Sequence, residues 1–348
     1  MAGKLALLLA MVGALTAGLT GLYAYRASRQ LLVESAQDKL LTSTQVLARR
    51  ITLSRQEIAR NLKVLANHPA AVSVLQQNDV AQARQMTALF GLMMSANPSY
   101  FQLRLISASE HGLERVRVDR QGDKAIEVTG DDLQEKGHLP YVAETLKLRA
   151  GESYLSEIAV NHERGTSAGL DQPALQLASP VTDARGIALG VVVINVDLNG
   201  MFALLAADLP KSFKLFLAND DGDILIHPDA SRAFGFDKGR RMLIQDEFTP
   251  TREVVEGKRE HVVFDATDLN LGSDPVVAAF IGQNVDVPSH EQRLVLGLAQ
   301  PLAEVVAQAR QLGTAILQIV LGLCLACLLL AAILARAFTR PINAMSAA

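Results

Sequence analysis

The sequence predicts an α+β fold: a long N-terminal helix, then two modules that are each built on an antiparallel sheet, with a transmembrane helix on either side. Three features of the 348 residues support this prediction. Uncharged apolar segments lie near both ends. A helical repeat of apolar residues follows the first segment without any glycine or proline. Farther along, the apolar repeat shortens to the two-residue alternation that is typical of strands.

The two apolar segments, residues 5–25 and 312–335, are each long enough to cross a bilayer, which takes about 20 residues of helix. The first exceeds the apolar stretch of a signal peptide, roughly 7–15 residues, so we expect an uncleaved anchor. A long polar region crosses a membrane largely regardless of its own charge. The expected topology therefore places residues 1–4 and the C-terminus in the cytoplasm and residues 27–311 outside.

Three regions are predicted between the spans. Residues 27–66 form a stalk helix that ends at Asn67-His68-Pro69. Residues 67–200 form a membrane-distal module, with a helix over 79–95 and a hairpin around 183–186. Residues 201–311 form a membrane-proximal module, with a hairpin turn at 219–222. Both modules end in an apolar strand and a helix, which indicates a weak internal repeat.

Composition excludes several classes of function. The net charge of −3 comes without a basic stripe, so nucleic acid is not an expected partner. Cys324 and Cys327 have a C-x-x-C spacing, but both lie in the second apolar segment, where we interpret them as membrane-helix residues. Seven histidines show no metal-ligand spacing, so neither a metal nor a cofactor is expected.

Several short stretches follow one another in a distinctive order: 115–120 (RVRVDR), 136–141 (KGHLPY), 151–156 (GESYLS), 178–181 (ASPV) with 190–197 (GVVVINVD), and 219–222 (NDDG) with 227–229 (HPD) and 234–236 (FGF). Together they resemble the double Cache receptors, whose extracytoplasmic region holds two PAS-like modules, and this resemblance covers nearly the whole chain. Arg340-Pro341-Ile342 resembles the start of a HAMP linker, here residues 336–348. An output domain is therefore expected to lie outside these residues.

The resemblance implies a sensory receptor of a bacterial inner membrane. A small molecule would bind the distal module, in the periplasm, and shift the terminal helices. The expected output is a histidine kinase, and a chemotaxis receptor or a diguanylate cyclase stays open as an alternative. A membrane-anchored scaffold that binds without signalling is the alternative from another class. A homodimer is expected because stalk and HAMP helices work in pairs.

Candidate ligand-binding residues come partly from the resemblance. Amino-acid-binding members carry Arg-x-Trp-Tyr and later aspartates. Here the stretch reads His138-Leu139-Pro140-Tyr141, so only the tyrosine matches, and an amino acid is not the expected ligand. Asn161 stands in place of the first aspartate, and Asp197 matches the second. Tyr154 joins Tyr141 as a candidate because a tyrosine offers both a ring and a hydroxyl.

Arg104 and Arg117 are candidates from the strand pattern alone. Both sit on predicted strands between alternating apolar residues. If they face inward, a carboxylate or another anion is the natural ligand; otherwise they are ordinary surface charges. Asp119 and Arg120 are expected to flank a turn.

An enzyme is the least favoured class. Residues 165–169 (GTSAG) match the G-x-S-x-G elbow of hydrolases, but that motif needs a strand before it and a helix after it. The surrounding sequence reads as a loop. No catalytic domain is expected within the 348 residues, and no catalytic residue is assigned.

Overall fold

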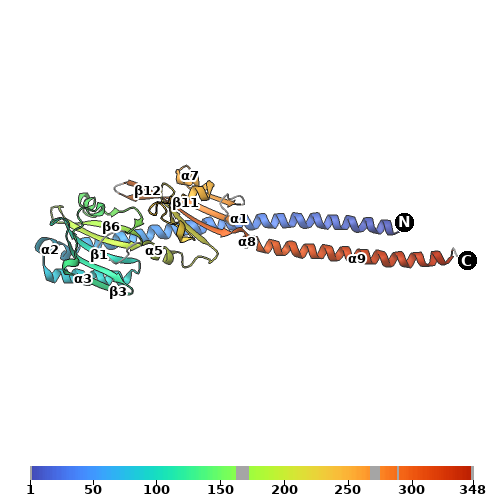
Figure 1. Ribbon diagram of the computed structural model, residues 1–348, viewed down its shortest axis with the longest axis horizontal. Coiled ribbons are helices and arrows are strands. Elements are labelled where there is room, and N and C mark those ends of the chain that lie inside the picture. Colours follow the sequence, from blue (N-terminus) through green and yellow to red (C-terminus); the bar gives the residue numbers. More distant parts are fainter. Residues whose placement is uncertain (1, 162–171, 267–274, 288–289, 346–348) are drawn as a thin grey trace. The chain divides into compact units, whose positions relative to one another are not determined.

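A computed structural model describes residues 2–161, 172–266, 275–287 and 290–345. The chain divides into two compact units: residues 41–262 with 279–298, and residues 1–40 with 263–278 and 299–348. The GTSAG stretch at 165–169 lies outside the described residues. The observed elements match the predicted α+β class, with a long N-terminal helix and two sheets (Figure 1).

Helix α1 (Ala2–Ala66) confirms the predicted long N-terminal helix, which runs without interruption through the predicted stalk residues 27–66. His68 caps the helix that follows, α2 (Pro69–Gln77), by accepting a hydrogen bond from the Ala70 amide at 3.2 Å. Asp79 caps α3 (Val80–Ala96) in the same way, at 2.8 Å from the Ala81 amide. These caps satisfy amide groups that have no partner inside the helix, which explains why the chain restarts its helix at these points.

The distal module contains a seven-stranded sheet in the order β3-β2-β1-β7-β6-β4, with β5 also paired to β6. Its pairs are antiparallel, and β1 lies between β2 and β7. The predicted hairpin around 183–186 joins β6 to β7. The strands are β1 (Tyr100–Ser107), β2 (Glu114–Gln121), β3 (Lys124–Val128), β4 (Tyr154–Leu155), β5 (Ala159–Val160), β6 (Pro173–Thr182) and β7 (Ala188–Asp197).

The two faces of this sheet are covered by different elements. Helices α2 and α3 contact one face (Figure 1). Gly190 is required there, because a side chain would collide with the Ile106 carbonyl and with Leu75 of α2. The opposite face carries the short helix α4 (Pro140–Ala143), which packs Tyr141 and Val142 against strand residues. Two 3-10 turns, η1 (Gly130–Asp132) and η2 (Thr145–Lys147), flank it in the chain.

The proximal module contains a five-stranded sheet in the order β10-β11-β12-β8-β9. The predicted turn at 219–222 joins β8 to β9, and Gly222 there has a φ of +88°. Phe216, Phe248 and Phe280 pack with ring centroids 5.2–5.9 Å apart. The elements are α5 (Leu198–Leu205), β8 (Lys214–Ala218), β9 (Ile224–Ile226), η3 (Ala230–Arg232), α6 (Ile244–Glu247), η4 (Thr249–Thr251), α7 (Arg252–Val255), β10 (His261–Ala266), β11 (Val276–Val287) and β12 (His290–Pro301).

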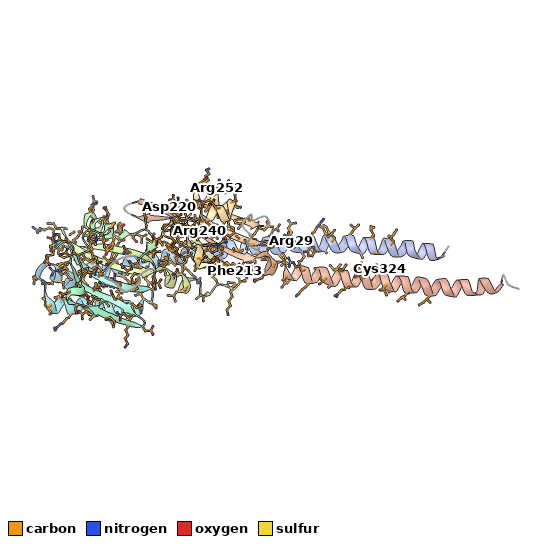
Figure 2. The ribbon with its side chains drawn as sticks, viewed as in Figure 1. Arg29, Phe213, Asp220, Arg240, Arg252 and Cys324 are labelled. Atoms are coloured by element: carbon orange, nitrogen blue, oxygen red, sulfur yellow. The ribbon has the colours of Figure 1, made fainter. Side chains whose placement is uncertain are left out.

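The chain continues through α8 (Leu302–Val305) into α9 (Ala307–Met345), which carries Cys324 (Figure 2). Among the described residues, one helical segment, Ala307–Ala326, is long and apolar enough to cross a membrane. It overlaps the second predicted span. The first predicted span, residues 5–25, lies within α1 and is not among these candidates, so it stays a prediction. Gly21 of α1 lies against Ile316 of α9.

Asp119 and Arg120 lie at the end of β2, directly before the predicted turn at Gly122. Asp119 is buried, and Arg120 donates hydrogen bonds to the carbonyls of Tyr100 and Asn97, at 2.8 and 3.1 Å. Both residues therefore have partners within the fold that the sequence did not indicate.

The proximal module holds a buried charge cluster. His227 Nε2 lies 3.2 Å from Glu247 Oε2, and Arg232 Nη1 lies 3.2 Å from the same oxygen. The His227 ring also packs edge-on against Phe216 at 5.1 Å. Burial raises the pKa of Glu247, but the hydrogen bonds and charges of His227 and Arg232 outweigh it. The pKa of Glu247 is therefore lowered from its usual 4.5.

We expect Glu247 to make the proximal module sensitive to acid. A carboxyl group with a lowered pKa contributes stability that is present above its unfolded pKa and is lost as the pH falls through its folded pKa. The free energy of unfolding should therefore drop as the pH is lowered below 4.5 and on through the lowered pKa of Glu247. Glu247→Gln should remove this dependence and cost about 1–3 kcal/mol at pH 7. Urea unfolding at several pH values measures the pH dependence and the loss of unfolding free energy. Glu253→Gln, at an exposed position, is the control. Equal effects of the two substitutions would contradict the prediction.

Candidate ligand-binding site

A buried polar network covers part of the distal sheet on the face that carries α4. Its residues come from the three neighbouring strands β2, β1 and β7, and the register places Arg104 opposite Arg117 and Gln102 opposite both Asp119 and Asn195. All members are buried: Gln102, Arg104, Glu114, Arg117, Asp119 and Asn195. Strand alternation places Gln102 with Arg104 and Arg117 with Asp119, because every second residue of a strand points to the same face. The register shift between Leu105 and Ile106 brings Glu114 opposite Ile106 and so onto this face.

Hydrogen bonds connect the network from end to end. Arg117 donates two hydrogen bonds to the Asp119 carboxylate, at 3.0 and 2.6 Å, and the Gln102 side chain donates one at 2.8 Å. Asn195 links Gln102, at 3.0 Å, to Arg104, at 3.3 Å. Glu114 closes the network with ion pairs to Arg104 at 3.4 Å and to Arg117 at 3.5 Å.

The charges within this network balance: two guanidinium groups face two carboxylates. Burial disfavours the charged form of Arg117, but the hydrogen bond to Asp119 and the charges of Asp119 and Glu114 raise its pKa. Arg104 also lies over the Tyr141 ring, 5.0 Å from the centroid. The network thus fixes the position of an aromatic side chain on α4.

A cavity of about 540 Å³ adjoins this network. It lies over strands β4, β5 and β6 and next to α4. Three of the predicted site residues line it: Tyr141, Tyr154 and Asn161. The other lining residues are Leu139, Pro140, Ser156, Glu157, Ala159, Val160, Ala174 and Gln176.

Several polar groups of this lining are available to a ligand. Asn161 is buried, whereas Glu157 is exposed at the rim. In the described part of the chain, the Tyr154 hydroxyl and the side-chain amide of Gln176 make no hydrogen bond, and the Glu157 carboxylate has no ion-pair partner. Burial raises the pKa of Tyr154, and the negative charges of Glu157 and Glu144 raise it further.

The remaining predicted residues lie outside the cavity lining. Arg104 and Arg117 point inward, onto the face that carries α4, but within the network. Asp197 ends β7, where its carboxylate folds over Gly200 and its Oδ1 is buried without a hydrogen bond. Sequence reasoning missed Glu157 and Gln176. The alternation along β6 could have indicated Gln176, since it shares a face with Ala178, whereas Glu157 follows a strand of only two residues.

Comparison with known proteins identifies the family. Residues 32–245 match the family model of the bacterial histidine kinase sensor domain. The chain belongs to this family. No curated protein matches the sensor domain by sequence.

Solved structures share the fold of this sensor domain at low sequence identity. The extracellular domain of the histidine-kinase candidate vpHK1S-Z8 is 17% identical, with a TM-score of 0.64, covering 80% of this chain and 98% of that one. A domain of a candidate sensory box/GGDEF protein from Vibrio parahaemolyticus is 17% identical, with a TM-score of 0.63, and the match covers 79% of this chain and 99% of that domain. The ligand-binding domain of the Campylobacter jejuni chemoreceptor Tlp3, in complex with L-norvaline, is 11% identical, with a TM-score of 0.51, covering 79% and 94%.

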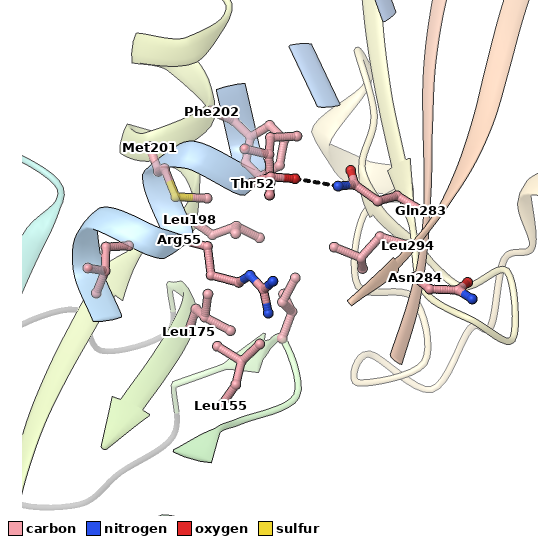
Figure 3. A pocket seen from close by; sticks show the side chains of 13 residues that line it. Thr52, Arg55, Leu155, Leu175, Leu198, Met201, Phe202, Gln283, Asn284 and Leu294 are labelled. Carbon is pink, nitrogen blue, oxygen red and sulfur yellow. Dashed lines mark hydrogen bonds between the residues drawn. The ribbon is translucent and has the colours of Figure 1, made fainter. Parts of the chain in front are cut away.

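A second, smaller cavity of the sensor domain, about 50 Å³, lies beside the stalk helix (Figure 3). Its wall is mostly apolar, with Ile51 and Ile58 from α1, Leu155 and Leu175 from the distal strands, and Leu294 from β12. A hydrogen bond from the Gln283 side chain to the Thr52 hydroxyl joins β11 to α1 across it. We call it the junction cavity.

Because the charges of the polar network balance, removing one of them should lower the unfolding free energy more than removing an exposed charge. Glu114→Gln would leave two buried guanidinium groups with one carboxylate, and we expect a loss of about 3–5 kcal/mol in unfolding free energy. Glu110→Gln is the matched control, since Glu110 pairs with Arg115 at an exposed position, and it should cost about 1 kcal/mol or less. Urea unfolding followed by circular dichroism compares the two; similar losses would show that the network is not a special constraint.

Proposed function

We propose that this chain is the input region of a transmembrane histidine kinase, in which a small molecule binds the distal cavity and changes the packing at the junction cavity. The cavity itself carries the proposal. Its volume of about 540 Å³ falls in the usual range of ligand sites, about 300–1,000 Å³. Its lining combines apolar side chains with a few polar groups, as such sites do.

Other cavities fit a ligand less well. The junction cavity, at about 50 Å³, is too small for most metabolites. A polar cavity of about 520 Å³ near Glu260 and His261 is comparable in volume, but most of its lining residues lie outside the stretch 32–245 that matches the family model. The distal cavity lies wholly within that stretch.

In this proposal the predicted site residues act in two ways. Tyr141, Tyr154 and Asn161 contact the ligand directly. Arg104 and Arg117 form the floor of the site and hold Tyr141 through the contact between Arg104 and its ring. Asp197 acts at the end of β7, where the distal sheet passes into α5.

Strand alternation supplies a route for the signal. Tyr154 and Gln176 line the distal cavity, whereas their chain neighbours Leu155 and Leu175 line the junction cavity. Successive side chains of a strand point to opposite faces. A ligand that shifts β4 or β6 must therefore change the packing against the stalk helix. The shift in population is limited by the difference in ligand affinity between the two arrangements.

The membrane arrangement belongs to the same proposal. Residues 5–25 and 312–335 would span the inner membrane, with both termini in the cytoplasm and residues 27–311 in the periplasm. The distal module, 67–200, would bind the ligand, and the proximal module, 201–311, would connect it to the second span. A homodimer would pair the stalk helices.

A substitution that fills the distal cavity tests whether the ligand binds there. Gln176→Phe should fill the distal cavity from the middle of β6 without breaking a side-chain hydrogen bond. A thermal-shift screen of the full chain in detergent should yield compounds that stabilise the wild type, by about 2.7 kcal/mol at a hundredfold excess over Kd. The variant should melt like the wild type without ligand and lose the shift. Gln121→Phe, at the exposed end of β2, is the control; a shift that survives in Gln176→Phe would place binding elsewhere.

A substitution at the junction tests transmission separately. Thr52→Val removes the hydroxyl that Gln283 contacts, at a cost of about 0.5–1.5 kcal/mol. Ligand affinity should stay within about threefold, less than 1 kcal/mol. The change in hydrogen exchange that ligand causes in β11 should become smaller, while Thr42→Val, exposed on α1, should leave it intact. An unaltered change in Thr52→Val would argue against this route.

A further inference from the structure

The wall of the distal cavity carries negative charge. Among the described residues that line it, Glu157 is the one charged side chain, and neither arginine, lysine nor histidine is present. Glu157 also lines a neighbouring cavity, where Asp220 and Asp221 lie together with Arg293. Glu157 is therefore the charge that the described wall of the distal cavity presents to a ligand.

The basic groups nearest in the fold are already engaged. Arg104 and Arg117 lie in the polar network, where Glu114 and Asp119 balance their charge. Lys136 is buried in the loop before α4 and does not line the cavity. A carboxylate ligand would thus meet no cation at the described wall and would face Glu157. Bringing two carboxylates together is unfavourable.

The lining offers what a cation needs. Tyr154 presents an aromatic ring, and ring faces attract ammonium groups. The Tyr141 ring already contacts Arg104 and so contributes apolar surface only. The Tyr154 hydroxyl and the Gln176 amide can accept hydrogen bonds from an amine, and the Glu157 carboxylate can neutralise its charge. The pKa of Tyr154 is raised first by burial and then by the charges of Glu157 and Glu144, which agrees with carboxylates lying near its hydroxyl.

We infer that the distal cavity binds an organic cation, a primary or quaternary amine, with its charged group between Glu157 and Tyr154. This inference rests on the proposed function and narrows it to one ligand class. It replaces the anion expected from Arg104 and Arg117, because the structure commits those charges to the network.

The test is a thermal-shift and calorimetric comparison on the full chain in detergent. The probes are the chloride salts of ethanolamine, choline, putrescine and phenethylamine, against sodium acetate, pyruvate and malate at equal ionic strength. We expect at least one amine to raise the melting temperature and none of the carboxylates to do so. Glu157→Gln should weaken the amine about tenfold, and Glu135→Gln, also exposed, should change Kd less than twofold. Binding should weaken as salt increases, since Glu157 is exposed.

The outcomes separate the inference from the proposed function. If a carboxylate binds and Gln176→Phe abolishes its binding, the distal cavity is the binding site, as proposed, but the cation inference is overturned. If an amine binds with unchanged affinity in Glu157→Gln, the inference is overturned even though a ligand exists. If none of these amines shifts the melting temperature, the inference also fails. If an amine binds equally well to Gln176→Phe, the site itself is wrong and both proposals fall.

Discussion

Balanced burial of charge on the distal sheet is the constraint on which the rest of the sensor domain depends. Arg104, Arg117, Glu114 and Asp119 are buried together, and removing one partner of a buried ion pair costs several kcal/mol because the other charge remains uncompensated. These charges therefore fix the register of β1 against β2, and Asn195 extends the constraint to β7. Since Arg104 also contacts the Tyr141 ring, the same network supports α4 beside the distal cavity.

The second constraint is the two-residue alternation of β4 and β6. Each of these strands lines both cavities: one face borders the distal cavity, and the other borders the junction cavity at the stalk helix. Packed interiors respond to small shifts by changing between discrete arrangements and not by gradual deformation. In the proposed function a ligand needs no long relay, because the strands that it would touch also line the junction cavity together with α1.

Much of the fold could be predicted from the sequence because its signals are local. The uninterrupted helical repeat of α1, the capping residue Asp79 and the turns at 183–186 and 219–222 all depend on neighbouring residues. The site was harder, since its chemistry depends on pairing between distant strands. Arg104 and Arg117 were recognised as unusual strand residues, but only the register shows that Glu114 and Asp119 balance them. Glu157 was missed because it follows a strand of only two residues. The alternation along β6 could have indicated the face on which Gln176 lies, but not that this residue shares a cavity with Tyr141.

In the proposed function, ligand in the distal cavity alters the packing on the other face of β4 and β6. The most direct measurement is NMR of methyl-labelled leucines in the full chain, titrated with the amine that stabilises it most. We expect the methyl resonances of Leu155 and Leu175 to shift in proportion to saturation, while those of Leu225, in the proximal module, shift less. Saturation that moves neither Leu155 nor Leu175 would contradict this expectation, because binding would then leave the junction at the stalk helix unchanged.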